Sequence, residues 1–131
     1  MKVLALDYGA ARTGVAASDA TGTIALPLGV VERAATPAGL ARIGELVREQ
    51  GAQHVVVGLP LTLRGEHGQQ ARETEDFVRA LREVLDVPVE TYDERFTTAI
   101  AAQVSGGAPE DARAAAHLLE GYLTRTGQGR A

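Results

Sequence analysis

Residues 1–19 read MKVLALDYGAARTGVAASD, and this stretch decides the fold. An apolar strand over residues 2–8 carries one carboxylate, Asp7, at its end, and a short turn leads into a second strand over residues 14–19. A strand that is buried on both faces normally excludes a carboxylate, because an unpaired charge is costly to remove from water. We therefore expect Asp7 at the mouth of the strand, where a cation or a phosphate–metal complex reaches it.

The rest of the chain predicts three further strands and four helices. The turns at 9–13 and 20–23 are too short for crossovers, so a third strand at 24–32 completes an antiparallel meander. Thr36 as N-cap and Pro37 at the first helical position then begin a helix. The expected later elements are this helix to Gln50, a strand at 54–58, a helix at 68–85, a strand at 87–92, helices at 94–104 and 109–123, and a frayed tail from Thr126.

This order predicts an α/β fold with a five-stranded mixed sheet. Two right-handed crossovers make the fourth and fifth strands parallel to the first. The expected strand order is 3-2-1-4-5 with only strand 2 antiparallel, which is the ribonuclease H-like arrangement. Ligands in open α/β sheets bind at the carboxyl ends of the parallel strands. Those ends carry Asp7, the segment Gly58-Leu59-Pro60, and Asp93-Glu94.

Composition narrows the class of protein. The 131 residues predict one domain over 1–131, and the chain has no cysteine, no apolar run long enough for a membrane span and no signal-peptide pattern. We expect a cytoplasmic location. The net charge of −4 argues against a protein that coats nucleic acid generally. It leaves room for a nucleic-acid enzyme, because carboxylates that hold divalent cations lower the net charge.

Four segments resemble the YqgF family of RuvC-type nucleases, also called RuvX. They are LALDYGAARTGVAASD, VVVGLPLTLRGEHGQQAR, YDERFTT and PEDARAAAHLLEGYL, and they occur in the order and spacing of that family. The resemblance covers almost the whole chain. It implies a ribonuclease H-like fold and a metal-dependent nuclease that matures the 5′ end of pre-16S ribosomal RNA. Many members of the family are instead labelled Holliday junction resolvases.

The resemblance also implies a catalytic set of carboxylates. Asp7 matches the acid on the first strand, Glu94 the second acid, and Asp111 the acid on the last helix, with Asp93 as a further metal ligand. Mg²⁺ and Mn²⁺ prefer oxygen ligands, and a pair of such ions hydrolyses phosphodiesters in many nucleases. Each acid also has a structural alternative. Asp7 is a suitable turn residue, and the other acids suit helix N-termini.

Two departures from the family pattern stand out. RuvC proteins proper carry an acid on the strand that here ends Val57-Gly58-Leu59-Pro60, where this chain has none. The second acid is expected to have moved to the next strand. Many relatives also place a lysine just before the acid of the last helix. This chain lacks that lysine, so its phosphate contact is either missing or supplied by Arg113.

Several basic and hydroxyl side chains in the motif loops are candidate substrate contacts. Each is also compatible with an ordinary surface role. They are Arg12, Arg64, Arg72, Arg95, Thr97 and Thr98. The few aromatic residues argue against a base-stacking platform for single strands. The expected partners are precursor ribosomal RNA or branched DNA, together with the ribosomal precursor particle, and the chain is expected to act as a monomer or homodimer.

Three functions remain open at the level of sequence. The first is the metal-dependent nuclease. The second is a nucleotide-binding half of the actin and sugar-kinase type, which needs two such domains to enclose ATP. The third is a non-catalytic module of ribosome assembly or transcription. Within the first, the acidic balance favours RNA processing over junction resolution, because a resolvase needs a broad basic face and usually a two-fold dimer.

Overall fold

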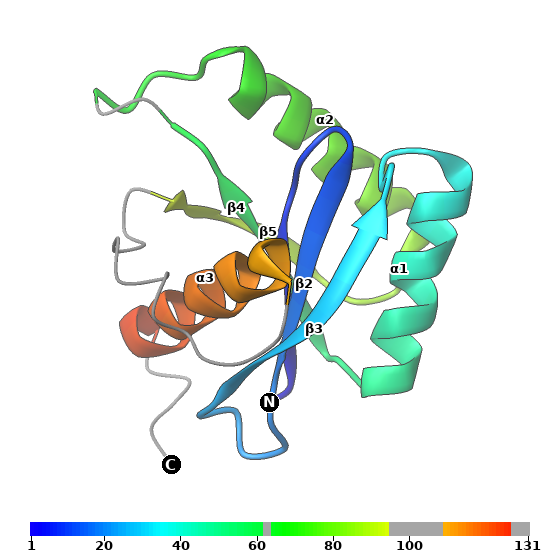
Figure 1. The fold of residues 1–131 in the computed structure, drawn as a ribbon, viewed down its shortest axis with the longest axis vertical. Helices are drawn as coiled ribbons and strands as arrows, with labels where there is room; N and C mark the ends of the chain where they lie inside the picture. Colours follow the sequence, from blue (N-terminus) through cyan, green and yellow to red (C-terminus); the bar gives the residue numbers. More distant parts are fainter. Residues whose placement is uncertain (62–63, 95–108, 127–131) are drawn as a thin grey trace.

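A computed structural model gives the fold of the chain and describes residues 1–61, 64–94 and 109–126. Eight elements make up this part of the chain (Figure 1). They are β1 (Val3–Asp7), β2 (Arg12–Ser18), β3 (Ala25–Glu32), α1 (Pro37–Gln50), β4 (His54–Leu59), α2 (Gln69–Val84), β5 (Val89–Asp93) and α3 (Glu110–Thr126).

The five strands form one mixed sheet in the order β3-β2-β1-β4-β5. β2 is antiparallel to both of its neighbours, whereas β4 is parallel to β1 and β5 is parallel to β4. The predicted strand order and directions are therefore confirmed. Asp7 is paired with Gly14 in the β1–β2 ladder, and Leu59 with Asp93 in the β4–β5 ladder.

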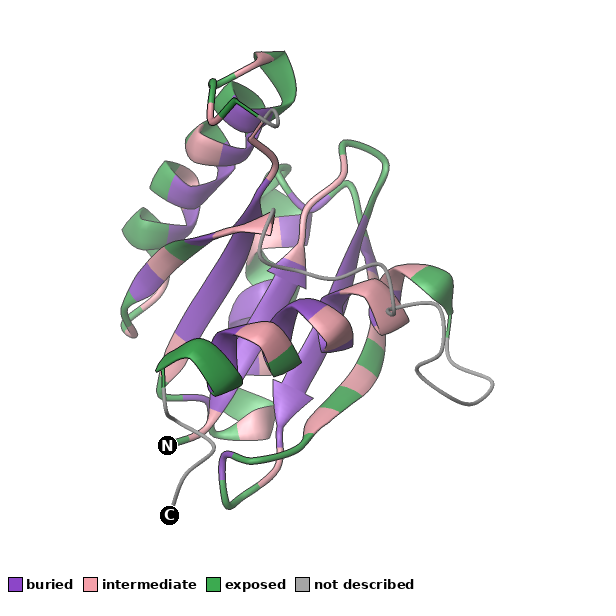
Figure 2. Ribbon diagram, turned by 90° about the vertical axis from the view of Figure 1, so that its left-hand side faces the viewer, coloured by how far each residue is buried: buried purple, intermediate pink, exposed green. Residues whose placement is uncertain are grey.

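Helices cover both faces of the sheet. α1 and α2 pack on one face, and α3 packs across β1, β2 and β3 on the other, as Figure 2 shows from the α3 side. β1 contributes side chains to the cores on both faces, because successive side chains of a strand point to opposite faces. Leu4 and Leu6 join the core under α1 and α2, while Val3 and Ala5 join the core under α3. This full burial explains why the strand reads as a continuous apolar run that ends in one acid.

The ends of α1 follow the expected capping chemistry. The Thr36 hydroxyl accepts a hydrogen bond from the Gly39 amide at 3.2 Å, and Pro37 occupies the first turn. Gly51 ends the helix with φ of 64°, a left-handed conformation that favours glycine. The predicted bounds of this helix are confirmed.

Other boundaries differ from the prediction by a few residues. β5 begins at Val89 rather than Val87, because Pro88 has no amide hydrogen for the ladder, although its carbonyl accepts from the Val55 amide at 2.9 Å. β2 begins two residues earlier, at Arg12, and α3 continues to Thr126 rather than ending near residue 123. The predicted helix at 94–104 falls almost entirely on residues 95–108, which lie outside the described residues.

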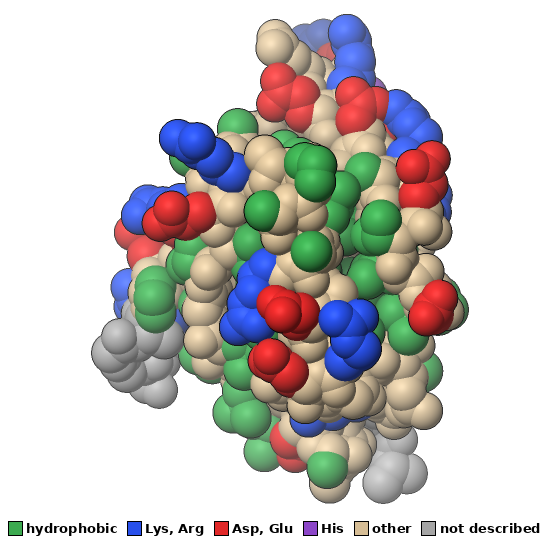
Figure 3. All heavy atoms as spheres, turned by 90° about the vertical axis from the view of Figure 1, so that its right-hand side faces the viewer, with side chains coloured by type: hydrophobic (Ala, Val, Ile, Leu, Met, Phe, Trp, Pro, Cys, Tyr) green, Lys and Arg blue, Asp and Glu red, His purple; other side chains and the backbone are tan. Residues whose placement is uncertain are grey.

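The molecular surface on the side of α1 and β3 has mixed charge. Figure 3 shows acidic and basic side chains interspersed there, with apolar side chains between them. β3 is an edge strand, and its Leu26 and Leu28 are exposed. This face is therefore not a continuous basic surface. Among the described helices, none is long and apolar enough to cross a membrane.

Candidate active site

The turn after β1 places Asp7 at the carboxyl edge of the sheet. Thr13 is fully buried, and its hydroxyl lies 3.4 Å from both the amide nitrogen and the carbonyl oxygen of Gly9. Gly9 is required for the close turn, because a Cβ there would lie 2.5 Å from the Arg12 carbonyl oxygen. Tyr8 stacks on Phe77 of α2 with ring centroids 4.4 Å apart. These contacts fix the turn, and Asp7 remains half-buried at its start.

Glu94 reaches Asp7 across β4. Glu94 directly follows β5, Asp7 ends β1, and β4 lies between these two strands. The Glu94 and Asp7 side chains nevertheless form a hydrogen bond. Gly58 of β4 makes this possible, because a Cβ at that position would lie 2.6 Å from Glu94 Oε1. A glycine inside a strand often marks such a close approach.

The hydrogen bond between two carboxyl groups requires a proton, since an ionised carboxylate only accepts. Burial, then the hydrogen bond to Asp7, and then the charges of Asp7 and Asp93 raise the pKa of Glu94 to about 8. Burial also raises the pKa of Asp7, the hydrogen bond from Glu94 lowers it, and the charge of Asp111 raises it further. Glu94 is therefore the donor and Asp7 the acceptor. The proton reduces the repulsion between these carboxylates, and a bound cation would reduce it in the same way.

Asp111 approaches the same edge from the other side of the sheet. It lies in the first turn of α3, where its carboxylate Oδ2 is 3.2 Å from Arg12 Nε. Its backbone packs closely on β2, since a Cβ at Gly14 would lie 1.8 Å from the Asp111 carbonyl oxygen. Gly14 is also the ladder partner of Asp7. The helix that carries the third acid is thus seated directly beside the strand pair that carries the first.

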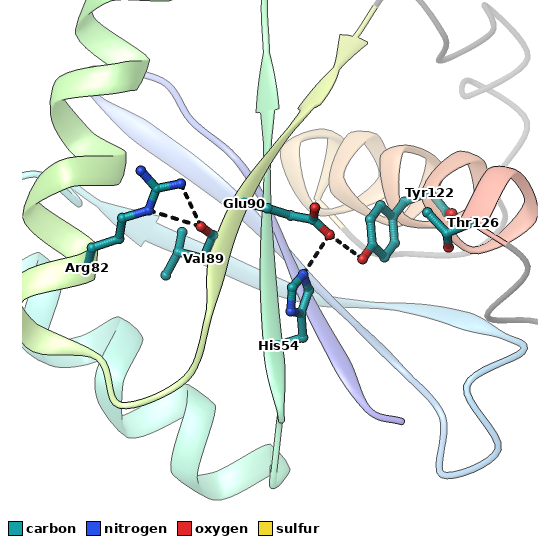
Figure 4. Close-up of polar contacts among 6 residues, drawn as sticks. All are labelled: His54, Arg82, Val89, Glu90, Tyr122 and Thr126. Carbon is teal, nitrogen blue, oxygen red and sulfur yellow. Dashed lines mark hydrogen bonds and ion pairs between the residues drawn. The ribbon is translucent and has the colours of Figure 1, made fainter.

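Polar contacts on both sides of β5 hold that strand in place (Figure 4). Arg82 of α2 donates from Nε and Nη2 to the Val89 carbonyl oxygen at 3.0 and 2.8 Å. On the other side, Glu90 accepts a hydrogen bond from the Tyr122 hydroxyl of α3 and lies 2.7 Å from His54 Nε2. Burial and the contact with Glu90 raise the pKa of Tyr122. These contacts orient the strand whose end carries Glu94.

The other predicted site residues divide into three groups. Asp93 lies at the end of β5, half-buried, and its charge raises the pKa of Glu94. Arg64 and Arg72 are exposed, the former in the loop after β4 and the latter in the first turn of α2. Arg95, Thr97 and Thr98 lie outside the described residues. Arg113 is half-buried in α3, and its Nε has no hydrogen-bond partner in the part of the chain that the structure describes.

Two positioning residues, Gly14 and Gly58, were not among the predicted site residues. Both are glycines within predicted strands, a pattern that indicates close approach of another group. The sequence alone does not say which group approaches, because Asp111 and Glu94 are distant along the chain. The contacts of His54, Glu90 and Tyr122 were likewise not predicted, since His54 and Glu90 lie outside the four segments and Tyr122, within the last of them, was given no role.

The donor chemistry of the acids fits a hard divalent cation. Asp7 and Glu94 supply carboxylate oxygens from neighbouring parts of the sheet edge, and Asp111 approaches them closely enough to raise the pKa of Asp7. In the described residues, no group of three or more His, Cys, Asp or Glu side chains is gathered tightly enough to hold a metal ion. The carboxylate of Asp111 is instead paired with Arg12.

Comparison with known proteins gives the family. The sequence matches the RuvX family, described as Holliday junction resolvase, over residues 1–125. The chain belongs to the RuvX family. Among relatives of this RuvX chain, a protein of Chloroflexus aggregans is 49% identical over 102 residues, covering 78% of this chain and 72% of its own length. One of Moorella thermoacetica is 39% identical and covers 98% of both chains. Both are named "Putative pre-16S rRNA nuclease".

A solved structure shares the fold of this RuvX chain. It is described as T. thermophilus RuvC in complex with Holliday junction substrate, with a TM-score of 0.64, 18% identity, and coverage of 98% of this chain and 97% of the other. At this level of identity the similarity concerns the fold alone. The predicted RuvC-like, ribonuclease H-like fold and the predicted family are both confirmed.

Proposed function

We propose that this chain is a metal-dependent nuclease that hydrolyses phosphodiester bonds during 5′-end maturation of pre-16S ribosomal RNA. The observation that carries the proposal is the hydrogen bond between Asp7 and Glu94, with Asp111 close by. Asp7 and Glu94 lie at the edge of the sheet where α/β proteins bind ligands, and Asp111 approaches that edge from α3. The names of the relatives support the substrate.

In this proposal Asp7, Glu94 and Asp111 hold Mg²⁺ or Mn²⁺, and Asp93 adds a nearby negative charge. When bound, such ions supply an activated water and offset charge on the phosphate. Glu94 must give up its proton before it ligates a cation, so metal binding competes with the proton that Asp7 and Glu94 share.

Basic side chains of the motif loops position the substrate in this proposal. Arg12, Arg64 and Arg72 contact backbone phosphates, as arginine does through paired N–H donors. Arg95, Thr97 and Thr98 are assigned the same role from the sequence motif alone. Arg113 is a further candidate, because its Nε lacks a partner among the described residues. We place the protein in the cytoplasm, acting on ribosomal precursor particles as a monomer or homodimer.

A second candidate function is Holliday junction resolution. The description of the RuvX family and the DNA-bound RuvC structure favour it. Against it stands the net charge of −4. A resolvase contacts many phosphates on a branched duplex, and each such contact requires positive charge. We therefore rank RNA processing first.

One experiment compares the candidates directly. Purified protein is incubated with Mn²⁺ or Mg²⁺ and either labelled precursor 16S RNA or a four-way DNA junction, under identical salt. We expect metal-dependent cleavage of the RNA that EDTA and Asp7→Asn abolish. Paired symmetric nicks in the junction with intact RNA would favour the resolvase. Binding of precursor particles without cleavage of either substrate would favour the non-catalytic module.

A further inference from the structure

Arg12 and Asp111 form an ion pair that joins β2 to α3 beside the candidate site. Arg12 opens β2, Asp111 lies in the first turn of α3, and Nε and Oδ2 are 3.2 Å apart. The two side chains differ in exposure, with 66% of Arg12 and 35% of Asp111 accessible to solvent. The contact therefore connects a proposed phosphate-binding residue to a proposed metal ligand.

The two partners also differ in their freedom to move. The backbone at Asp111 is fixed against β2, where a Cβ on Gly14 would overlap the Asp111 carbonyl oxygen. Arg12 has a long, mostly exposed side chain, and among the described residues its charged end is held by the Asp111 carboxylate. An exposed ion pair shifts an equilibrium by no more than about fivefold. Arg12 is thus the partner that can leave the contact at small cost.

The charges at the site favour release of Arg12 from Asp111 when a cation binds. Without a cation, Arg12 is the positive group beside Asp111, whose charge otherwise acts on Asp7. A divalent cation on the three acids supplies that positive charge itself and repels the guanidinium. A released guanidinium at the site mouth is then free for a phosphate, which it binds through two parallel N–H donors.

We propose that Arg12 is a positioning residue that exchanges partners, from Asp111 in the metal-free protein to a substrate phosphate once a divalent cation engages Asp111. The proposal rests on the nuclease function proposed above. It makes cation binding and nucleic-acid binding mutually reinforcing, because each favours the state in which the ion pair is open. A static ion pair that merely fastens α3 to β2 would produce no such coupling.

The test measures how many phosphates the protein contacts with and without a cation. Affinity for a short, fluorescently labelled single-stranded RNA is followed between about 50 and 200 mM KCl, in EDTA and in a fixed concentration of Ca²⁺, with RNA integrity checked on a gel. Each phosphate contact adds about 0.7 to the steepness of log K against log salt for single strands. We compare the natural protein with Arg12→Gln and Arg12→Lys.

We expect the natural protein and Arg12→Gln to have equal slopes in EDTA, where Asp111 occupies Arg12. In Ca²⁺ the slope of the natural protein should be steeper than that of Arg12→Gln by about 0.7. Arg12→Lys should keep the steeper slope because it retains the charge. Ca²⁺ itself should bind Arg12→Gln as tightly as the natural protein or up to about fivefold more tightly, because the competitor for Asp111 is gone.

Arg42→Gln is the matched control. Arg42 is also an exposed arginine in ion pairs, with Glu45 and Glu49 at 3.4 and 3.3 Å on α1. Its loss should change neither slope. Equal losses of slope for Arg12→Gln in EDTA and in Ca²⁺ would make Arg12 a constant phosphate contact and overturn the exchange. Equal slopes for both proteins in both conditions would make the pair purely structural and overturn it as well.

These outcomes are separable from failure of the proposed function. If the natural protein cleaves RNA with Mn²⁺ while the slopes do not diverge, the exchange is wrong and the nuclease function stands. If the natural protein neither binds a divalent cation nor cleaves RNA, the nuclease function itself is wrong. Cation binding by calorimetry and cleavage on a gel give these two readings independently of the slopes.

Discussion

Gly58 lies directly beneath the carboxyl group of Glu94, so that a Cβ on Gly58 would come within 2.6 Å of Oε1 and 2.9 Å of Cγ of that side chain. An acid on β4 and an acid reaching over β4 would compete for this space. The absence of an acid on β4 and the presence of Glu94 after β5 are therefore linked, because the two acids would occupy the same space. Glycine on β4 opens the path by which Glu94 reaches Asp7.

Replacing Gly58 by alanine should lower the nuclease activity while leaving the free energy of unfolding nearly unchanged. The nearest atoms to the new Cβ belong to the flexible Glu94 side chain, which can turn away. Alanine also costs less backbone entropy than glycine in a strand, by about 0.5–1 kcal/mol. We expect the free energy of unfolding in urea to stay within about 1 kcal/mol of the natural protein. RNA cleavage should fall at least tenfold, since a displaced Glu94 carboxylate no longer lies beside Asp7 to ligate the cation. Unchanged cleavage would contradict this account.

Replacing Gly14 by alanine should instead damage the fold. The new Cβ would meet the backbone carbonyl of Asp111, which moves only if α3 moves. Overpacking of this kind costs about 1–3 kcal/mol. The matched control is Gly29→Ala on β3, where nothing lies within 4 Å of the new Cβ. Urea denaturation should show a loss for Gly14→Ala and no loss for Gly29→Ala. Equal stability of the two variants would refute the close packing of α3 on β2.

The metal-free protein should lose stability as pH rises through the neutral range. The pKa of Glu94 is about 8 in the folded protein, well above its unfolded value of 4.5, so the folded state binds more protons between these values. Stability linked to this group is full below about pH 4.5 and declines as pH approaches 8. The raised pKa of Asp7 acts in the same direction. In EDTA, we expect the melting temperature to fall by about 3 °C or more from pH 5 to pH 8.

The Glu94→Gln variant is the control for this pH dependence. It keeps a side chain of similar size that can still donate to Asp7, but it cannot ionise. Its melting temperature in EDTA should vary less between pH 5 and pH 8 than that of the natural protein. An identical pH dependence in both proteins would assign the effect to other groups.

Divalent cations should stabilise the natural protein more than Asp7→Asn. A ligand at about 100 times its dissociation constant adds about 2.7 kcal/mol to the free energy of unfolding. Asp7→Asn removes one ligand and one repelling charge, so this variant should melt at a higher temperature in EDTA and gain little from Mn²⁺. Thermal melts with increasing Mn²⁺ measure both effects. A full Mn²⁺ response in Asp7→Asn would place the cation elsewhere.

Local patterns were sufficient to predict most of the fold. Short turns around β2 indicated the antiparallel pairs, and the capping residues Thr36 and Pro37 marked the start of α1. The candidate acids were named from the resemblance to the YqgF/RuvX family, since an acid that ends a strand or opens a helix also has an ordinary structural role. The contacts among them could not, because they depend on close approaches between distant segments, such as Glu94 over Gly58. The pairing of Arg12 with Asp111 could not be predicted either, because the two residues are distant along the chain and each alone suits an ordinary surface role.

The seating of α3 against Gly14 has a consequence for the timing of synthesis. Among the described elements, β1 leaves the ribosome before α3, and a nascent chain folds as it emerges. Until α3 docks, Asp7 and Glu94 have no third acid beside them. In the proposed function, the nuclease therefore has no complete set of acids until α3 has been synthesised and has docked. It would cut RNA only after α3 has left the ribosome that made it.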